Sequence, residues 1–496
     1  MSVQVVWLKR DLRLTDHLPL VEAAKRGPVA LLYVYEPDLW AEPEFDGSHL
    51  GFIGECLDAM DEALAPLGTR VVRCVGRLRV VLDELRAFWA DQGGLGGLFS
   101  HQETGGLWTY ARDRRVGRWC RNHGVPWSEF VQDGVERGPS QRDGWASRWK
   151  RFMQQPLAPE ATWQPAPLPP RDAVTDTFEG LCKSLGMVPT SIVERQPGGA
   201  SVAEAWLDSF LRKRVVDYAK GMSSPVTAWE ACSRLSPYLA WGALSQKQVL
   251  HRLEAFKRGR PKFREGYEAF QSRLAWRSHF IQKLEDEPEM EVRSLDPAVD
   301  RVRPDRGLDL PALEAWMKGE TGYPLVDACM RALARTGWIN FRMRAMVVSF
   351  SSYHLWQPWP TPAKRLARHF LDFEPGIHYP QFQMQSGTTG INALRIYDPV
   401  KQVRDQDPDG QFIRQWVPEL ARVPVQHLAE PHRMSGIEQA EAGCRIGVEY
   451  PAPIVENVPS IVKARRIIES VRRRPESRAR SRDVHRRHGS RRGRRR

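Results

Sequence analysis

The sequence predicts an N-terminal α/β domain, a long connector and a C-terminal α-helical domain. Three observations lead to this fold class. Short β-branched or aromatic runs alternate with helical patterns from residue 2 to about 130, a Pro-rich stretch follows, and apolar residues then recur at helical spacing from Ser201 to about Leu428. Strands and helices in alternation are typical of a doubly wound, Rossmann-like parallel sheet with helices on both faces.

The predicted α/β domain covers residues 1–132. Its expected strands are VQVVWL, VALLYVYE, GTRVVRCV and GLGGLFSH, and a helix is expected to begin near Leu18. These runs are rich in Val, Leu and aromatic residues, as parallel strands buried on both faces are.

The predicted connector covers residues 133–199 and the predicted helical domain covers residues 200–462. Between Pro156 and Gly199 the composition becomes Pro-rich and irregular, and PAPLPP at Pro165–Pro170 interrupts both helix and strand. Beyond it, Trp, Leu and Arg recur three and four residues apart, which indicates helices. No internal repeat is found.

Size and composition exclude several classes of protein. A chain of 496 residues exceeds what one core normally holds, so two domains are expected. No apolar run approaches the roughly 20 residues that cross a bilayer, and MSVQVVWLKRD lacks the pattern of a secretory signal, so we expect a cytoplasmic protein. The seven cysteines have neither CxxC nor His-linked spacing, so no metal site is predicted.

The net charge of +13 is confined to the C-terminal tail, residues 463–496. This segment has 16 Lys or Arg and 3 acidic residues, so the remainder of the chain has no formal net charge. Because the tail has few apolar residues, we expect it to be disordered. It is either a sequence-independent contact to DNA phosphates or a solvated extension without a function.

Three motifs carry a resemblance to a known family. The blocks GETGYPLVDACMRALARTGWINFRMRAMVVSF (Gly319–Phe350) and GQFIRQWVPEL (Gly410–Leu420) resemble the flavin-binding helical domain of the DNA photolyase and cryptochrome family, and WLKRDLRLTDH (Trp7–His17) resembles its opening signature. The resemblance covers nearly all of residues 3–460 and places the chain in a divergent bacterial-type branch.

The resemblance implies FAD in the helical domain and damaged DNA as the partner of a monomeric protein. In relatives the α/β domain can hold an antenna pigment of folate or deazaflavin type, and HQETGGLWTYARD (His101–Asp113) lies where its contacts would be expected. Some bacterial relatives hold an iron-sulfur cluster on four cysteines. Only Cys232, Cys329 and Cys444 fall in the helical domain here, so no cluster is predicted.

A helix is predicted to begin where Ser236 precedes Pro237, with Ser236 as its N-cap. The N-H groups at a helix start can bind a pyrophosphate, although simple capping is the commoner use of such a serine. The resemblance implies that FAD phosphates and ribose contact a set of residues in which Cys232 replaces the usual Thr: Tyr218, Cys232, Ser233, Arg234, Leu235 and Ser236.

Arg342 and Arg344 lie two residues apart, about 200° around a helix, so they cannot serve the same face. Two solvated arginines would be the simpler reading, but their neighbours are apolar. The resemblance implies that Arg344 pairs with Asp372 beside the isoalloxazine ring and that Arg342 contacts a DNA phosphate. It also places Glu374 near the ring.

His378 stands where an Asn commonly faces flavin N5. Because imidazole titrates near neutral pH, we predict that His378 controls the protonation of N5. The alternative is a histidine that packs against its own loop.

The lesion-binding residues implied by the resemblance are preserved only in part. Trp276 matches the Trp that stacks on the damaged bases, and Arg277 matches the neighbouring Arg of the family. The other DNA-binding positions differ from the family's pattern: Arg273 for Glu, Phe341 for Asn, Ala345 for Met and Met384 for a second Trp.

The family's chain of tryptophans for photoreduction is predicted to be broken at its start. Phe382 occupies the first position, Trp359 matches the middle one, and Phe is much harder to oxidise than Trp. Photoreduction is therefore expected to be slow or to use another route, through Trp338 or Tyr379.

Two functions from different classes remain. The first is an FAD-dependent, blue-light-driven photolyase that splits pyrimidine dimers by electron transfer from reduced FAD. The second is a cryptochrome-type photoreceptor without repair activity, whose partner is a signalling protein. A non-catalytic nucleic-acid binder that keeps the fold is a more remote third.

Overall fold

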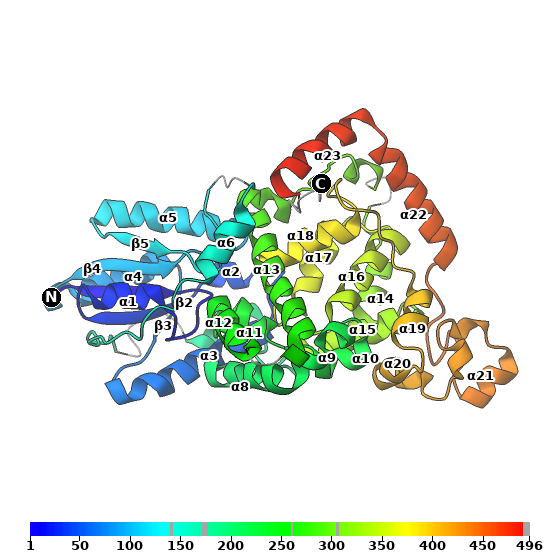
Figure 1. The fold of residues 1–496 in the computed structure, drawn as a ribbon, viewed down its shortest axis with the longest axis horizontal. Helices are drawn as coiled ribbons and strands as arrows, with labels where there is room; N and C mark the ends of the chain where they lie inside the picture. Colours follow the sequence, from blue (N-terminus) through cyan, green and yellow to red (C-terminus); the bar gives the residue numbers. More distant parts are fainter. Residues whose placement is uncertain (139–141, 171–176, 259–260, 304–306, 490–496) are drawn as a thin grey trace.

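The computed structural model describes residues 1–496 except 139–141, 171–176, 259–260, 304–306 and 490–496. It has an N-terminal α/β domain and a larger helical domain (Figure 1). The predicted fold class is confirmed.

The α/β domain is built on a five-stranded parallel sheet in the order β3-β2-β1-β4-β5. Val5 of the central strand pairs with Ala30 on one side and Leu98 on the other. The chain order reverses between β1 and β4, and the gap outside such a reversal is where ligands bind in open α/β sheets. The strands are β1 (Val3–Leu8), β2 (Val29–Tyr35), β3 (Val72–Val75), β4 (Leu95–His101) and β5 (Trp127–Phe130).

Helices cover both faces of this sheet because alternate strand residues point to opposite sides. Val6 and Leu8 pack in the core formed with α1 (Leu18–Ala24) and α3 (Gly47–Leu64). Val5 and Trp7 pack in the core formed with α4 (Leu78–Phe88) and α5 (Leu107–His123). Helix α2 (Pro37–Trp40) follows β2.

The connector is anchored to the α/β domain along part of its length. Val29 of β2 forms an isolated parallel bridge with Pro165, and the Trp89 indole donates to the Pro167 carbonyl at 2.9 Å. Helices α6 (Trp145–Met153) and α7 (Phe178–Leu185) also lie in the connector. The hydrogen bonds of the bridge come from the Gln164 carbonyl and the Ala166 N-H, on either side of Pro165, and Pro167 contributes its carbonyl.

From α8 onward the described chain is helical, and the domain boundary at residue 200 stays a prediction. Its helices to residue 442 are α8 (Ala200–Ser209), α9 (Val215–Gly221), α10 (Pro225–Ala231), α11 (Ser236–Ala240), α12 (Gln246–Lys257), α13 (Arg264–Asp286), α14 (Leu310–Lys318), α15 (Pro324–Thr336), α16 (Phe341–Ser349), α17 (Pro360–Ala367), α18 (Pro375–Ser386), α19 (Pro399–Gln406), α20 (Gln411–Trp416) and α21 (Gly436–Ala442). Helix α13, the longest, spans 23 residues and packs against α18 and α9. Within the described residues, no helix is long and apolar enough to cross a membrane.

The expectation of a disordered tail is wrong for the part of it that the structure describes. Two helices, α22 (Asn457–Arg472) and α23 (Pro475–His488), lie against the helical domain (Figure 1). Ala464, Ile468 and Val471 are buried at a spacing of four and three residues. A few apolar residues at helical spacing are enough when a folded surface is available to receive them. Residues 490–496 lie outside the described residues.

The loop that follows β1 forms hydrogen bonds between the two domains. Arg10 donates to the Phe373 carbonyl at 2.8 Å, and Arg13 donates to the Gly242 carbonyl at 3.0 Å. Gly242 has a φ of +73°, and a Cβ there would lie 2.1 Å from the Arg10 carbonyl oxygen. Only glycine accommodates both this conformation and this contact.

Candidate active site

A buried ion pair occupies the meeting point of two loops of the helical domain. Arg344 of α16 donates to Asp372 at 2.7 Å, to the Ile339 carbonyl at 2.9 Å, and lies 4.1 Å above the Phe370 ring. The Asp372 side chain is 3% exposed. Its second oxygen, Oδ1, is buried and has no hydrogen-bond partner among the described residues. Such an oxygen can accept a hydrogen bond from a ligand.

Local sequence explains how these loops form. Helix α15 ends at Gly337, whose φ of +72° is the left-handed conformation that commonly terminates helices. The Asn340 amide donates to the carbonyls of Met222 and Ser223, which fixes the start of α16. The Leu371 N-H donates to the Gly337 carbonyl at 3.1 Å, so the two loops hold each other.

The segment from Cys232 to Ser236 differs from the prediction by one residue. Helix α11 begins at Ser236, with Leu235 rather than Ser236 in the N-cap position. The helix has five residues, so its dipole is small. Ser233 accepts from the Leu235 N-H at 3.4 Å, a weak local bond that leaves its hydroxyl available.

The Arg234 side chain is committed to an aromatic cage. Its guanidinium lies 4.1 Å from the Trp338 ring centroid and 4.4 Å from that of Trp229, and it donates to Gln196 at 3.2 Å. Burial lowers the pKa of Arg234 to about 10, so it remains a cation at neutral pH. The backbone φ of +60° places Arg234 in the left-handed region, a strain that these contacts offset.

Tyr218 and Cys232 lie beside this segment. Tyr218 is buried and meets the rings of Phe210 and Phe270 edge-on. Burial raises the pKa of the Cys232 thiol to about 12, and the Cys232 carbonyl accepts a hydrogen bond from Arg214. Cys232 is therefore an uncharged group, and its thiol is a much weaker hydrogen-bond donor than the hydroxyl of Thr.

Arg277 connects three parts of the chain. It contacts Asp133 at 2.9 Å and Glu374 at 3.1 Å, and donates to the Leu239 carbonyl at 2.9 Å. Burial raises the pKa of Glu374 even though Arg10 and Arg277 oppose it. The sequence analysis matched Arg277 to a family Arg without naming its partners, and it missed the contacts of Asp133 and Arg10. Only the position of Arg10 in the N-terminal signature could have indicated a role.

His378 is neutral at physiological pH, contrary to the expectation of titration near pH 7. Burial lowers the pKa of His378 to about 4. Its Nε2 lies 2.8 Å from the Ala363 carbonyl, which only accepts, so Nε2 carries the proton and Nδ1 carries the lone pair. At neutral pH this imidazole can accept a hydrogen bond at Nδ1 but is a poor base.

The aromatic positions of the predicted electron route are all buried. Trp359 donates to Ser294 at 2.8 Å, and its ring lies 6.4 Å from that of Phe382. Trp338 stands 5.1 Å from Trp229. The Tyr379 hydroxyl donates to Glu44 of the α/β domain at 2.5 Å.

The predicted DNA-binding residues occupy a more exposed surface. Trp276 of α13 is 41% exposed and Phe341 at the start of α16 is 50% exposed, which is unusual for such large apolar side chains. Arg342 and Met384 are half-buried. The Arg342 Nε atom has no hydrogen-bond partner among the described residues.

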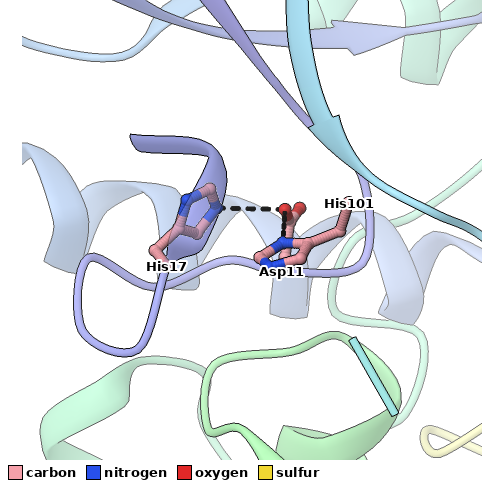
Figure 2. A group of neighbouring side chains, drawn as sticks. All are labelled: Asp11, His17 and His101. Atoms are coloured by element: carbon pink, nitrogen blue, oxygen red, sulfur yellow. Dashed lines mark hydrogen bonds and ion pairs between the residues drawn. The ribbon is translucent and has the colours of Figure 1, made fainter. Parts of the chain in front are cut away.

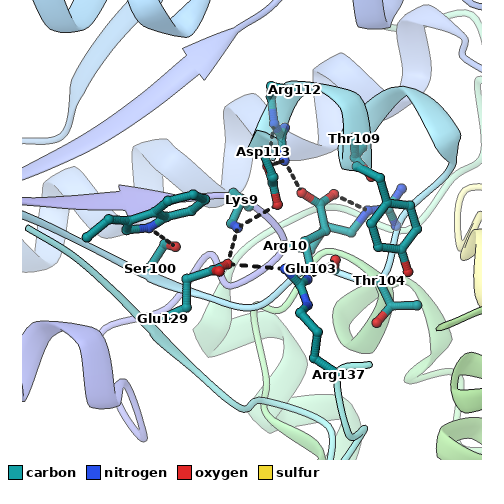
Figure 3. Close-up of polar contacts among 12 residues, drawn as sticks. Lys9, Arg10, Ser100, Glu103, Thr104, Thr109, Arg112, Asp113, Glu129 and Arg137 are labelled. Atoms are coloured by element: carbon teal, nitrogen blue, oxygen red, sulfur yellow. Dashed lines mark hydrogen bonds and ion pairs between the residues drawn. The ribbon is translucent and has the colours of Figure 1, made fainter. Parts of the chain in front are cut away.

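A cavity of about 380 Å³ lies between the two domains, outside the ends of β1 and β2. The predicted antenna segment contributes Glu103, Trp108 and Arg112 to its wall. Figure 3 shows the charged side chains beside it, where Arg112 contacts Glu103 at 2.5 Å. Arg112 also lies 3.2 Å from Glu36. Eight of the 24 residues of its wall are aromatic: Trp7, Tyr33, Trp40, Phe45, Trp108, Trp241, Phe373 and Tyr379.

Asp11, His17 and His101 form a buried cluster near the same strand ends (Figure 2). Asp11 lies 3.0 Å from His17 Nε2 and 2.7 Å from His101 Nδ1. Because His17 Nδ1 accepts the Leu20 N-H, its Nε2 must carry a proton. A metal at Nε2 would leave His17 without any ring proton, so this cluster is better suited to hydrogen bonding than to metal binding.

Comparison with known families decides the identity. A model described as the FAD binding domain of DNA photolyase matches residues 270–470, and one described as DNA photolyase matches residues 4–135. A deoxyribodipyrimidine photo-lyase of Streptomyces griseus is 31% identical over 92% of this chain and 97% of its own length. The chain belongs to the DNA photolyase and cryptochrome family.

Two solved structures of this family have the same fold. A bacterial class III photolyase from Agrobacterium tumefaciens has a TM-score of 0.79 at 24% identity, over 96% of this chain and 98% of its own. A cryptochrome from Synechocystis has a TM-score of 0.78 at 22% identity, over 94% and 99%. Photolyases and cryptochromes thus share this architecture, so fold alone does not distinguish them.

The residues at the two loops fit FAD. Asp372 offers an unsatisfied oxygen, Arg344 supplies a cation next to it, and Ser233 offers a hydroxyl group. These are the groups that a polar heterocycle with a pyrophosphate chain requires.

Proposed function

We propose that this protein is a blue-light-driven DNA photolyase that splits pyrimidine dimers with an electron from reduced FAD. The observation that carries the proposal is the arrangement of α13. Trp276 points to solvent, while its neighbour Arg277 is buried against Glu374 on the flavin-binding loop. Helix α13 therefore presents an aromatic side chain to solvent and a cation to the protein interior. This arrangement would bring DNA bound at Trp276 close to a cofactor buried beside Arg277.

Residues of the helical domain would bind FAD and would stabilise the negative charge of its reduced ring. Tyr218, Ser233 and Ser236 would contact the phosphates and ribose, with Cys232 and Leu235 beside them. Arg344, oriented by Asp372, would stabilise negative charge near N1 of the ring. Reduced FAD supplies a single electron when illuminated, and His378 would accept a hydrogen bond from N5 through its unprotonated Nδ1.

The exposed surface would hold the extruded lesion. Stacking on Trp276 is worth about 1–3 kcal/mol per base, and Phe341 adds a second apolar contact. Arg342 would contact a phosphate, and Met384 would line the lesion pocket. Since few polar groups of the family pattern remain, we expect recognition to depend on stacking and phosphate contacts.

A cryptochrome-type photoreceptor is the second candidate. The observation that favours it is the loss of two lesion-reading residues of the family pattern, a polar Asn replaced by Phe341 and a second Trp replaced by Met384. In this case a signalling protein would bind in response to the flavin's redox change, and dimer-containing DNA would not bind preferentially.

The decisive experiment is repair of a defined thymine dimer in single- and double-stranded oligonucleotides. The protein is reduced chemically, which bypasses Phe382, and is illuminated with blue light beside a dark control. Light-dependent return of thymines establishes the photolyase. Absence of repair with stoichiometric reduced FAD refutes dimer repair and favours the photoreceptor.

We further propose that the cavity between the domains holds the antenna pigment. Its flat aromatic side chains suit a folate or a deazaflavin. Pigment extracted from the purified protein, identified by absorbance and mass, tests the assignment. Extraction of FAD alone from protein made in a host that supplies both pigments refutes it. We also expect a monomer in solution.

A further inference from the structure

The C-terminal helix α23 is docked on the end of α13, the helix that carries Trp276. Val484 packs in a small core with Leu284 and Leu295. Arg480 donates to the Leu295 carbonyl at 2.7 Å, and Ser481 donates to the Gly390 carbonyl at 3.0 Å. The tail therefore has a fixed position relative to the lesion-binding surface.

Glu287, directly after α13, holds the far end of α23. It accepts from His488 at 2.9 Å and from Arg480 at 3.1 Å, and Arg487 lies 3.6 Å away. Burial raises the pKa of Glu287, but the His488 hydrogen bond and the neighbouring cations outweigh burial and lower it. Glu287 is thus a carboxylate at neutral pH, and α23 is held by a charged contact.

One side of α23 presents cations to solvent. Arg478, Arg482 and Arg486 are exposed and four residues apart, so they form a single row along the helix; we call them the arginine row. Arg486 also pairs with Asp483 on the same helix. The opposite side holds Val484 and His488, which are buried.

The surface between this helix and Trp276 is also positive. Arg273, Trp276 and Lys283 recur along α13 three and seven residues apart, on one side of that helix. Burial and then the charge of Arg142 lower the pKa of Lys283 to about 8. Burial and then Lys283, Arg142 and His488 lower the pKa of His279 to about 2. The placement of Arg273 and Lys283 on one side of α13 favours an anionic partner.

We propose that the arginine row binds DNA phosphates that flank the lesion. The proposal rests on the proposed function. Glu287 follows Trp276 by 11 residues, which is about 16 Å along a helix and about five phosphates along one strand. Because the rest of the chain has no formal net charge, the tail supplies the electrostatic attraction that the body lacks.

The test compares two triple variants that remove equal charge. R478Q/R482Q/R486Q neutralises the row, and R465Q/R466Q/R473Q neutralises exposed arginines of α22 and its cap as a control. Binding of the FAD-loaded, full-length protein to a duplex with one thymine dimer is measured by fluorescence anisotropy at several salt concentrations. We expect the row variant to reduce the salt slope by about one unit per arginine, and the control to change it little.

The length of duplex beyond the dimer distinguishes a contact to flanking phosphates from a general effect of the lost charge. On a duplex with about three base pairs beyond the dimer on each side, the row variant should bind as the wild type does. On one with about twelve, it should bind about ten- to a hundredfold more weakly at physiological salt. Equal weakening on both duplexes, or wild-type binding on the long one, overturns the proposal. Matching circular dichroism of the variants shows that α23 remains folded.

If the proposed repair function is wrong but the arginine row still binds DNA, the measurements give a different result from failure of the row proposal. If the wild type binds damaged and undamaged duplexes equally and repairs neither, but the row still sets the salt slope, the phosphate contact stands without repair. If the row variant instead loses binding to anionic lipid vesicles and keeps wild-type DNA binding, the assignment to DNA is overturned.

Discussion

The Arg344–Asp372 pair allows the most direct test of how the proposed flavin site is stabilised. Replacing Arg344 with Met leaves the Asp372 carboxylate, 3% exposed, without its cation. Loss of one partner from a buried pair costs about 3–5 kcal/mol. Because the Arg344 side chain is 25% exposed, water screens part of the interaction, and we expect a cost of about 3 kcal/mol.

The complementary variant should cost less. D372N leaves Arg344 as the unpaired charge, and this side chain reaches solvent, so we expect a loss of about 1 kcal/mol. The double variant R344M/D372N has no uncompensated charge. Its loss of unfolding free energy should be about 2 kcal/mol smaller than the sum of the losses of the two single variants. Urea unfolding at a fixed excess of FAD gives each value, because bound FAD also stabilises the fold. Additivity within about 0.5 kcal/mol would show that the pair is not coupled and would refute the reasoning.

The same variants test the role of the unpartnered Asp372 Oδ1. If a donor on FAD satisfies this oxygen, D372N should weaken FAD binding by about tenfold, since a hydrogen bond to a charged group contributes about 1.5–3 kcal/mol. The dissociation constant is measured by recovery of flavin fluorescence. Unchanged affinity would place FAD away from this oxygen.

Four further predictions address other sites. Loss of stacking is tested by Trp276→Ala, which should weaken dimer binding by about 5- to 150-fold while FAD content, measured by absorbance, stays constant. Phe382→Trp should accelerate photoreduction, followed by bleaching of the oxidised flavin band; an unchanged rate would show that position 382 is not limiting. Gly242→Ala should destabilise the protein by more than 1 kcal/mol in thermal unfolding because its Cβ meets the Arg10 carbonyl. Phosphate binding favours charged Lys283, so DNA affinity should fall as pH rises through about 8, and Lys283→Met should abolish this dependence in anisotropy titrations.

The sequence was sufficient for the fold class because strand and helix patterns alternate cleanly as far as the Pro-rich connector. Within the site, the opposed directions of Arg342 and Arg344 follow from helical geometry alone. Their partners do not, because Asp372 is brought to Arg344 by a loop contact between Gly337 and Leu371. Such long-range contacts leave no local pattern; here only the family resemblance indicated the pairing.

Two predictions were wrong for physical reasons that composition does not reveal. The tail was expected to be disordered because it is polar, yet Ile468, Val471 and Val484 lie at positions where a folded surface receives them. His378 was expected to titrate near neutral pH, but burial lowers its pKa to about 4. Both outcomes depend on neighbours distant in sequence.

The cavity between the domains shares its wall with the loop and helix that follow Asp372. Phe373, Pro375 and Tyr379 line this cavity, and Glu374 stands between the first two. A molecule that orders these residues changes the free energy of the loop that carries Asp372. This loop positions Arg344 and, by our proposal, contacts FAD. By thermodynamic reciprocity, any occupant of the cavity that alters FAD affinity has its own affinity altered by the same factor when FAD binds.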